Sequence, residues 1–453
     1  MLKVNSVYEF DIVDMGINFE GIAKIDDGLT VFIPGALKGE KVKAKVIKIT
    51  NSFAVATISE IITKSKYREI SNCKYYDKCG GCMARHTTYE NTLDIKLENL
   101  KNTLKKQDID ISKINSIYGM SNPYYYRNKV QYPVREIDNE TKMGMFEKDS
   151  HIIVENDYCF IQDEIIHIVA KDLFDLVKQT KLKGYNEETK TGDVKNIMVR
   201  RGTHTGEIMC VLVINNKELV YGDEIKYIVN KITEKYNEIK SIILNINTKD
   251  TNVILSNENV CAFGKDYITD IIGDYVFKIT ADSFFQVNTI QAELLYNLLK
   301  ENFNLDKDKT LLELYSGVGS IGIFLSSFVK EIYSVEIVES AVIAAKENAR
   351  INNITNVINI VGDATKETLK LVNDGKYFNY IVVDPPRKGL DIEGIELILK
   401  LKPEKIGYVS CNPATLARDL KLLSDTYDIV SINAVDMFPW TSHIETIVIL
   451  NLK

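Results

Sequence analysis

One cysteine of this 453-residue chain has neighbours that suit a nucleophile. Cys411 lies in YVSCNPATLARDL, where an apolar, strand-like run ends and Asn-Pro opens a helix-like stretch. The amino terminus of a helix stabilises negative charge, and the thiolate is the nucleophilic form of a cysteine side chain. Cys411 is therefore a candidate nucleophile, with an inert core thiol as the alternative interpretation.

Two residues near the end of the sequence could serve as a base. His443 and Glu445 lie in FPWTSHIETIVIL, just before the last apolar run. A thiolate with a base suits the methylation of a uracil ring. Carbon 5 of uracil accepts a methyl group only after sulfur has added to carbon 6, and a base must then remove the carbon 5 proton. The sequence does not choose between the two residues, and a buried histidine or a strand-capping glutamate is the alternative.

A glycine-rich turn predicts a cofactor crevice. In LELYSGVGSIG, Gly317, Gly319 and Gly322 form G-x-G-x-x-G directly after a strand, and Glu336 ends the next strand. The pattern is typical of dinucleotide sites. It also suits S-adenosylmethionine, because both ligands need close backbone approach and an acid for the ribose hydroxyls. A tight turn without a ligand is the alternative.

Two aspartates at later strand ends favour S-adenosylmethionine. Asp363 in IVGDA could accept a hydrogen bond from the adenine amino group, and Asp384 begins DPPRKG after the fourth strand. The first and fourth strands of a doubly wound sheet flank the point where strand order reverses, so Asp384 should face the same crevice as residues 315–320. Methyltransferases that act on bases carry an acid or amide before Pro-Pro at this position. A simple cap is the alternative for each aspartate.

Three more cysteines stand close together in Cys73-KYYDK-Cys79-GG-Cys82, and Cys159 in DYCFI is the nearest later thiol. Four cysteines suit either zinc or a four-iron four-sulfur cluster, and the kind of ligand does not discriminate between these groups. A structural role without metal is the alternative interpretation.

The composition is that of a folded protein without membrane spans. Hydrophobic residues make up 45% and charged residues 26%, and no stretch approaches the roughly 18 consecutive apolar residues of a membrane span. The start, MLKVNSVYEF, lacks an apolar signal core, so we expect a cytoplasmic protein without disulfides. Cys210 and Cys261 lie in strand-like apolar runs and are expected in the core.

The net charge of -7 predicts no global basic surface, so any contact with nucleic acid must be local. Between Lys38 and Arg68 there are eight Lys or Arg residues against two Glu. Such a run is either a solvated strand face or an RNA-binding surface.

The hydrophobic pattern divides the chain into three segments. Residues 1–60 contain short alternating strands, with turns at Asp27-Gly28 and Pro34-Gly35, and predict a small β-barrel. Residues 61–280 mix strands and helices in a central α+β domain, in which TTYENTLDIKLENLKNTLKK reads as an amphipathic helix.

Residues 281–453 alternate regularly between apolar strands and helix-like stretches. The strands LLELY, EIYSVEI, VINIV, YIVVD, IGYVS and TIVIL predict an open, mostly parallel sheet with helices on both faces. IVSINAVDMF closely precedes the last strand, which indicates a hairpin and one antiparallel edge strand. The fold class is therefore α/β, with a Rossmann-like domain at the end.

These motifs resemble those of the RNA uracil-5-methyltransferase family, particularly its 23S ribosomal RNA branch. The resemblance covers essentially the whole chain: VFIPGALKGEKVKAKV looks like the family's TRAM domain, CGGC like its cluster and YRNKVQ like its central domain, followed in order by FFQVN, LELYSGVGS, DPPRKG, SCNP and TSHIET. Two departures are visible, because Ser320 stands where relatives often have Asn and Ser316 where some have Cys.

The resemblance implies an RNA uridine methyltransferase with Cys411 as nucleophile and favours Glu445 over His443 as the base. It implies that a four-iron four-sulfur cluster, rather than zinc, is held by Cys73, Cys79, Cys82 and Cys159. It implies an S-adenosylmethionine pocket made by Gln286, Tyr315, Ser320, Glu336, Asp363 and Asp384. It also suggests that a helix near residues 93–120 packs on the catalytic domain, and that the basic run meets RNA phosphates.

Other functions remain open from sequence. Transfer RNA is the alternative substrate. A methyltransferase for an exocyclic amine would need no cysteine. A nonenzymatic RNA-binding assembly factor would use only the barrel and the cluster, and a nicotinamide oxidoreductase rests on the glycine pattern alone.

Overall fold

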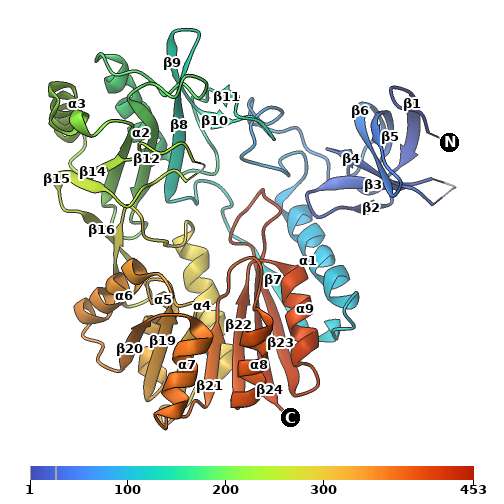
Figure 1. The fold of residues 1–453 in the computed structure, drawn as a ribbon. Coiled ribbons are helices and arrows are strands. Elements are labelled where there is room, and N and C mark those ends of the chain that lie inside the picture. Colours follow the sequence, from blue (N-terminus) through green and yellow to red (C-terminus); the bar gives the residue numbers. More distant parts are fainter. Residues whose placement is uncertain (1, 26–27, 252) are drawn as a thin grey trace.

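The N-terminal part of the molecule is a small, strongly curved sheet. A computed structural model describes residues 2–25, 28–251 and 253–453, so that Asp27 of one expected turn lies outside the described residues. The sheet has the strand order β1-β5-β6-β4-β3-β2 and stands apart from the rest in Figure 1. Its strands are β1 (Val7–Asp11), β2 (Asp14–Met15), β3 (Glu20–Lys24), β4 (Thr30–Pro34), β5 (Lys41–Ile49) and β6 (Phe53–Thr63).

Alternation of apolar and charged residues explains this sheet. In β5, Val42, Ala44 and Val46 are fully buried, while the lysines between them reach the surface. Part of the basic run is neutralised within the sheet, because Arg68 pairs with buried Glu40 at 2.5 Å. The other paired cations of the run are Lys38 with Asp14, Lys41 with Glu9 and Lys43 with Glu60.

A mostly antiparallel sheet forms the centre of the molecule, in the order β15-β14-β13-β12-β8-β9. Its strands are β8 (Lys129–Ile137), β9 (Glu140–Met143), β12 (Val194–Arg201), β13 (Ile208–Ile214), β14 (Ile239–Ile246) and β15 (Asn259–Gly264). The helices α2 (Glu164–Lys178) and α3 (Asp223–Lys235) bury their apolar sides against one face, and η2 (Lys217–Tyr221) precedes α3. A short pair, β10 (Met145–Phe146) and β11 (Ile153–Val154), lies beyond β9.

The C-terminal part contains the predicted α/β sheet, in the order β20-β19-β18-β21-β22-β24-β23-β7. Its strands are β7 (Ile114–Tyr118), β18 (Thr310–Leu314), β19 (Glu331–Glu336), β20 (Val357–Val361), β21 (Tyr380–Val383), β22 (Lys405–Ser410), β23 (Tyr427–Val435) and β24 (Glu445–Leu452). Apart from β24 the strands run parallel, so their carboxyl ends meet at one edge, which faces the central domain in Figure 1. This confirms the predicted fold class.

Helices cover both faces of this sheet. One face carries α4 (Thr289–Phe303), α5 (Ser320–Leu325) and α6 (Glu339–Ile351), with η3 (Ser326–Phe328) after α5. The other carries α1 (Tyr89–Lys105), α7 (Ala364–Asn373), α8 (Ile392–Leu401) and α9 (Pro413–Leu423), with η1 (Ile111–Lys113) before β7.

Two details of the prediction were wrong. The antiparallel strand β24 is not at the edge, because it pairs with β22 on one side and β23 on the other. The edge is occupied by β7, which lies in the segment assigned to the central domain and pairs parallel with β23. The helix expected near residues 93–120 is α1, which ends at Lys105, and η1 and β7 follow it. Its packing on the catalytic domain is as expected, since Leu100 and Leu104 lie in the same core as α9.

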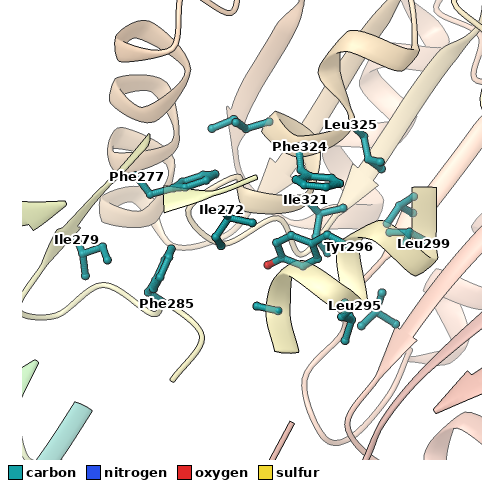
Figure 2. Packing of buried hydrophobic residues seen from close by; sticks show 14 of the residues in the cluster. Ile272, Phe277, Ile279, Phe285, Leu295, Tyr296, Leu299, Ile321, Phe324 and Leu325 are labelled. Atoms are coloured by element: carbon teal, nitrogen blue, oxygen red, sulfur yellow. The ribbon is translucent and has the colours of Figure 1, made fainter. Parts of the chain in front are cut away.

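A hairpin joins the central and catalytic sheets through a shared core. The hairpin consists of β16 (Tyr267–Ile272) and β17 (Tyr275–Thr280), and its apolar side chains lie against those of α4 and α5 in Figure 2. The same core includes Met198 and Val211 of the central sheet. Domain boundaries at residues 60 and 280 stay predictions.

Two cysteine predictions can be compared with the fold. Cys210 is fully buried in β13, as expected, whereas Cys261 in β15 is exposed, because β15 forms an edge of the central sheet. Within the described part of the chain, no helix is long and apolar enough to cross a membrane.

Candidate active site and cysteine cavity

The glycine turn after β18 is built to hold a carboxylate beside open space. Tyr315, with φ 63°, leaves the strand in the left-handed region, and its N–H donates to the Val335 carbonyl at 3.0 Å. The Gly317 N–H donates to Oε2 of Glu336 at 3.0 Å, which fixes that side chain at the end of β19. A Cβ atom on Gly317 would meet nothing within 4 Å, so this side of the turn is free for a ligand.

The third glycine of the motif, Gly322, is needed for packing and not for ligand access. A Cβ atom on Gly322 would lie 2.3 Å from Oε2 of Glu313, a fully buried residue whose carboxylate accepts from the Gly322 N–H at 3.0 Å and from Ser334. Burial raises the pKa of Glu313 to about 7. Gly322 therefore allows α5 to pack against the sheet, as the dinucleotide pattern predicts.

The other expected cofactor residues lie around the same turn. Asp363 caps α7, where its Oδ1 accepts from the Lys366 N–H at 3.0 Å, so the capping interpretation is correct for this oxygen. Burial, followed by the charges of Asp391 and Asp363, raises the pKa of Tyr315 to about 12. Ser320 begins α5 and shares a 2.8 Å hydrogen bond with the Tyr296 hydroxyl.

Gln286 reaches this region from the segment before α4. Its backbone carbonyl accepts a hydrogen bond from the Asn128 side chain at 3.0 Å, which attaches the segment to the start of β8. The Gln286 side chain is partly exposed, and in the described structure its amide makes no hydrogen bond. It is therefore free to contact a ligand.

Two carboxylates, buried Glu445 and half-buried Asp384, act on the pKa of the candidate nucleophile. Burial raises the pKa of Asp384 to about 7. Burial and then the charge of Asp384 raise the pKa of Glu445 well above its usual value. Burial, followed by the charges of Glu445 and Asp384, raises the pKa of Cys411 to about 11. In the part of the chain that the structure describes, neither carboxylate accepts a hydrogen bond, so Asp384 is not a simple cap.

The position of Cys411 is as predicted, but its electrostatic environment is not. Cys411 directly follows β22 and precedes Asn412, which caps α9 through a 3.1 Å bond from the Ala414 N–H. The helix terminus was expected to stabilise a thiolate. The structure shows a raised pKa instead, because burial and two carboxylates outweigh the helix terminus.

Arg387 is a site residue that the sequence interpretation missed. Its charge lowers the pKa of both Cys411 and Glu445, in opposition to burial. The Asn412 side chain donates to the backbone carbonyl of Arg387 at 2.9 Å, which connects the turn after β22 to the turn after β21. The available signal was its place three residues after Asp384 in DPPRKG, at the predicted sheet edge.

His443 lies beside Arg387 instead of beside the thiol. The Arg387 Nη2 atom is 3.2 Å from its Nε2, and burial together with the charges of Arg387 and Lys96 lowers the pKa of His443. Ser410 of β22 pairs with Thr446 of β24, so the antiparallel register brings Glu445 opposite Cys411. The Glu445 charge also raises the pKa of the thiol, after burial. The register therefore favours Glu445 as the group close to sulfur.

The loop between β23 and β24 is anchored by a buried ion pair that the sequence did not reveal. Lys96 of α1 lies 2.5 Å from Asp436, and both side chains are almost completely buried. Lys96 also donates to the His443 carbonyl at 2.8 Å, and the Tyr89 hydroxyl donates to Asp436 at 2.7 Å. Helix α1 thereby fixes the loop that leads to Glu445.

The four predicted cluster cysteines surround one cavity. Cys73, Cys79, Cys82 and Cys159 all line it, together with aromatic side chains. Burial raises the pKa of Cys79, Cys82 and Cys159, and the mutual influence of the thiols raises them further. The structure therefore brings Cys159 to the other three cysteines, as the sequence interpretation expected.

Arg85 points an unsatisfied cation at this cavity. It is 5% exposed, and its guanidinium lies 4.9 to 5.2 Å from the ring centroids of Tyr124, Phe160 and Trp440. One nitrogen donates to Asn72, but Nε and Nη1 are buried without a hydrogen-bond partner in the described structure. Two buried donors beside four thiols suit an anionic sulfur-rich group.

The cysteine cavity is attached to the catalytic loop. The Met83 N–H, directly after Cys82, donates to the Trp440 carbonyl at 2.8 Å. The Trp440 ring nitrogen donates in turn to the Pro123 carbonyl at 3.0 Å. Changes in the cysteine segment therefore reach the loop that carries His443 and leads to Glu445.

Comparison with known proteins yields matches along the whole chain. A family model described as tRNA (Uracil-5-)-methyltransferase matches residues 88–453, and a TRAM domain model matches residues 2–58. An uncharacterized RNA methyltransferase of Clostridium acetobutylicum is 42% identical over 453 residues, which covers 99% of this chain and 98% of the relative. One of Clostridium tetani is also 42% identical, with coverage of 99% and 97%.

A solved structure shares the fold over nearly the whole length. The tRNA (uracil-54, C5)-methyltransferase of Pyrococcus abyssi, in complex with S-adenosyl-L-homocysteine, superimposes with a TM-score of 0.78. The match covers 98% of this chain and 100% of that chain at 24% sequence identity.

Proposed function

The chain belongs to the tRNA (uracil-5-)-methyltransferase family and transfers a methyl group from S-adenosylmethionine to carbon 5 of uridine in RNA, and we propose that Cys411 and Glu445 perform the covalent steps. The observation that carries this proposal is the antiparallel pairing of Ser410 with Thr446, which brings Glu445 opposite Cys411, together with the charges of Glu445 and Asp384, which raise the pKa of the thiol further than burial alone. An exocyclic-amine methyltransferase would have no use for the cysteine.

The proposed reaction begins with the sulfur of Cys411. The thiolate, whose proton has left to solvent, forms a bond to carbon 6 of uracil, and the electrons of the ring double bond move to an enolate across carbon 5 and the carbonyl. The methyl donor supplies an electrophilic carbon on a sulfonium. Carbon 5 bonds to that methyl group, and the neutral thioether leaves with the electron pair of the broken bond.

Glu445 completes the reaction by taking the carbon 5 proton. The electrons of that bond restore the ring double bond, and the Cys411 thiolate leaves carbon 6 with its own electron pair. A buried carboxylate with a raised pKa is a stronger base than an exposed one, and the Glu445 carboxylate has this property. Arg387 supports the ionised forms of both groups.

The turn after β18 fits S-adenosylmethionine. Glu336 is held at the strand end where an acid can accept from ribose hydroxyls, and the open side of Gly317 leaves room for the ligand. Asp363 has one carboxylate oxygen left for the adenine amino group after capping α7. We assign the remaining contacts to Gln286, Tyr315, Ser320 and Asp384.

RNA containing 5-fluorouridine tests the covalent proposal. Fluorine on carbon 5 cannot leave as a proton, so the unmodified protein should form a stable protein–RNA adduct in the presence of S-adenosylmethionine. The adduct should map to Cys411 by mass spectrometry of the digested complex. A methylated product without any adduct would contradict covalent catalysis.

We propose that the cysteine cavity holds a four-iron four-sulfur cluster, as the resemblance implies, because its four cysteines line one cavity beside a buried cation. A cluster distributes its four cysteines over four irons. Cys73, Cys79, Cys82 and Cys159 would hold it, and the free N–H groups of Arg85 would face its negative charge.

We propose 23S ribosomal RNA as the substrate and structural order, not redox chemistry, as the role of the cluster. The support for the substrate is the combination of a TRAM domain with four convergent cysteines, which resembles the ribosomal branch. Mass mapping of methylated uridines in ribosomal and transfer RNA, from cells with and without the gene, tests this. Loss of a methyl group only from transfer RNA would contradict it. A cytoplasmic location follows from such a substrate and stays a prediction.

A further inference from the structure

A groove on the central domain has the properties of a nucleobase site. It lies between the ends of β8 and β12 and the turn that joins β10 to β11, and we call it the His151 groove. Its volume is about 340 Å³, at the lower end of the range for small-ligand sites. None of its lining residues belongs to the cofactor crevice or to the four cluster cysteines.

Two stacked rings form one wall of the His151 groove. The rings of Phe146 and His151 are nearly parallel, at 18°, with their centroids 4.9 Å apart. The His151 side chain is 67% exposed, so a planar group can continue the stack from solvent. Its Nδ1 lies 3.1 Å from Glu187, which fixes the ring orientation. Single-stranded RNA is bound in this way, by stacking of unpaired bases on aromatic side chains.

An unused amide lies at the back of the groove. Asn196 is 8% exposed, and among the described residues its side-chain amide has no hydrogen-bond partner. It follows a β-bulge in β12, where the register with β13 shifts between Val194 and Asn196. Bulges redirect a side chain out of the regular alternation of a strand. An amide with both a donor and an acceptor suits the edge of a base.

The charges around the rings are suited to phosphate. Four cations, Arg135, Lys190, Lys195 and Lys249, line the groove against the two carboxylates of Glu187 and Asp250. Arg135 is held by Glu187 at 2.8 Å and Lys190 by Asp250 at 3.1 Å. Within the described residues, Lys249 pairs with no carboxylate, whereas Lys195 is 7% exposed and donates to the Lys249 carbonyl at 2.9 Å. In a protein of net charge -7, this local excess attracts an anion.

The His151 groove continues towards the catalytic loop. A second hollow shares Phe146, His151 and Asn196 with it and extends to Cys82 and Met83. This hollow has no excess of positive charge, since Glu147 and Asp149 accompany Lys148. Met83 is the residue that is hydrogen-bonded to Trp440. A single RNA strand can therefore follow one surface from the catalytic loop to the groove.

We propose that the His151 groove binds an unstacked nucleobase of the RNA substrate, at a position in the strand away from the methylated uridine. The base stacks on His151, the Asn196 amide contacts its edge, and Lys249 contacts the phosphate. The proposal rests on RNA as the substrate of the enzyme and not on the identity of the nucleophile or of the RNA.

The proposal is tested by measuring the Kd of RNA for the cluster-containing protein. The RNA is an unmodified transcript of 23S ribosomal RNA or of transfer RNA, whichever accepts a methyl group from the enzyme. We expect His151→Ala and Asn196→Ala each to raise Kd about tenfold, as for the loss of one stacked or read base. The slope of log Kd against log salt should stay unchanged in both variants. Lys249→Ala should lower this slope by about one phosphate contact.

Two control variants and a cross-linking measurement accompany the binding test. His204→Ala removes an exposed histidine outside the groove and Lys226→Ala an exposed lysine on α3, and neither should change Kd. Ultraviolet cross-linking should attach a nucleotide to the peptide that contains residues 146–151. Unchanged Kd in the His151 and Asn196 variants without this cross-link would overturn the proposal. A reduced salt slope in His151→Ala would also overturn it, because the groove would then be only a charged surface.

The test is independent of the catalytic proposal. At saturating RNA, His151→Ala should still form the 5-fluorouridine adduct at Cys411. Absence of that adduct from the unmodified protein would contradict covalent catalysis and leave the RNA affinities interpretable.

Discussion

The active site and the cysteine cavity use sulfur in opposite ways. The active site holds one cysteine, with the two carboxylates of Asp384 and Glu445 and a cation, Arg387, that partly offsets their effect on the thiol pKa. The cysteine cavity holds four cysteines with a buried cation, Arg85, two of whose nitrogens have no hydrogen-bond partner among the described residues. In our proposal the first arrangement keeps a single sulfur free to form and break a bond with carbon. The second would gather sulfurs that become stable as anions when a positively charged group binds between them.

The two sites also differ in what positions them. The active-site residues follow the ends of β18, β21 and β22, where the parallel sheet brings them together regardless of side-chain type. The cysteine cavity is assembled from an irregular segment and Cys159, without a sheet to align them. We therefore expect substitutions in the first site to affect chemistry and those in the second to affect folding.

Removal of the nucleophile should have the largest effect on activity. Cys411→Ala should reduce methyl transfer by roughly a thousandfold or more, because no other group can add to carbon 6. Radiolabelled methyl transfer to RNA measures this, and calorimetry should show unchanged binding of S-adenosylmethionine. Cys261→Ala, at an exposed cysteine on an edge strand, is the matched control. Full activity in Cys411→Ala would identify the site as one for amine methylation.

Removal of the base should slow the reaction at a later step. Glu445→Gln should lower the turnover by roughly 10²- to 10⁴-fold. It should also accumulate the covalent RNA adduct with ordinary uridine, since the carbon 5 proton then stays in place. Denaturing gel electrophoresis detects the adduct. His443→Gln serves as comparison, and accumulation of the adduct in that variant instead would transfer the role of base to His443.

A cysteine of the second site should matter for folding. Cys79→Ser should lower the iron content and the visible absorbance of the protein and reduce the free energy of unfolding by on the order of 5 kcal/mol. RNA affinity should fall as well, because the cysteine segment is attached to the catalytic loop by the hydrogen bond from the Met83 N–H to the Trp440 carbonyl. Denaturant unfolding and filter binding measure the two effects. Unchanged folding and RNA affinity would refute an ordering role for the cluster.

A carboxylate of the first site should make stability depend on pH. The pKa of Asp384 is raised to about 7 in the folded protein, so its contribution to stability is full below about pH 4 and is lost as pH rises through 7. Asp384→Asn removes this loss and should raise the free energy of unfolding at pH 8 by up to about 4 kcal/mol. Thermal unfolding at pH 5 and pH 8 measures the effect. An equal change at both pH values would contradict the assignment.

Regular periodicity made most of the fold predictable. The expected catalytic strands and the helix that starts at Glu339 are present, because continuous apolar runs between turns specify a buried parallel sheet. The position of β7 was not predictable, since five residues of ordinary strand character carry no information about a partner far along the chain. The exposure of Cys261 was missed for the same reason, because an edge strand and an inner strand have similar sequences.

The sites were predictable where a motif fixes the backbone. Glu336 and Cys411 follow strands at the places that their motifs indicated. The raised pKa of Cys411 was not predictable, because it depends on how far Asp384 and Glu445 are buried around it. Arg387 and Arg85 were missed because the role of a cation depends on its tertiary neighbours.

The early position of β7 has a consequence for how the chain is made. During synthesis, residues 114–118 leave the ribosome about 300 residues before their partner strand β23. Until then this segment has no sheet to join, and its apolar side chains stay available to chaperones. Completion of the catalytic half therefore awaits the last part of the chain, and a protein truncated before β23 leaves β7 without its partner strand.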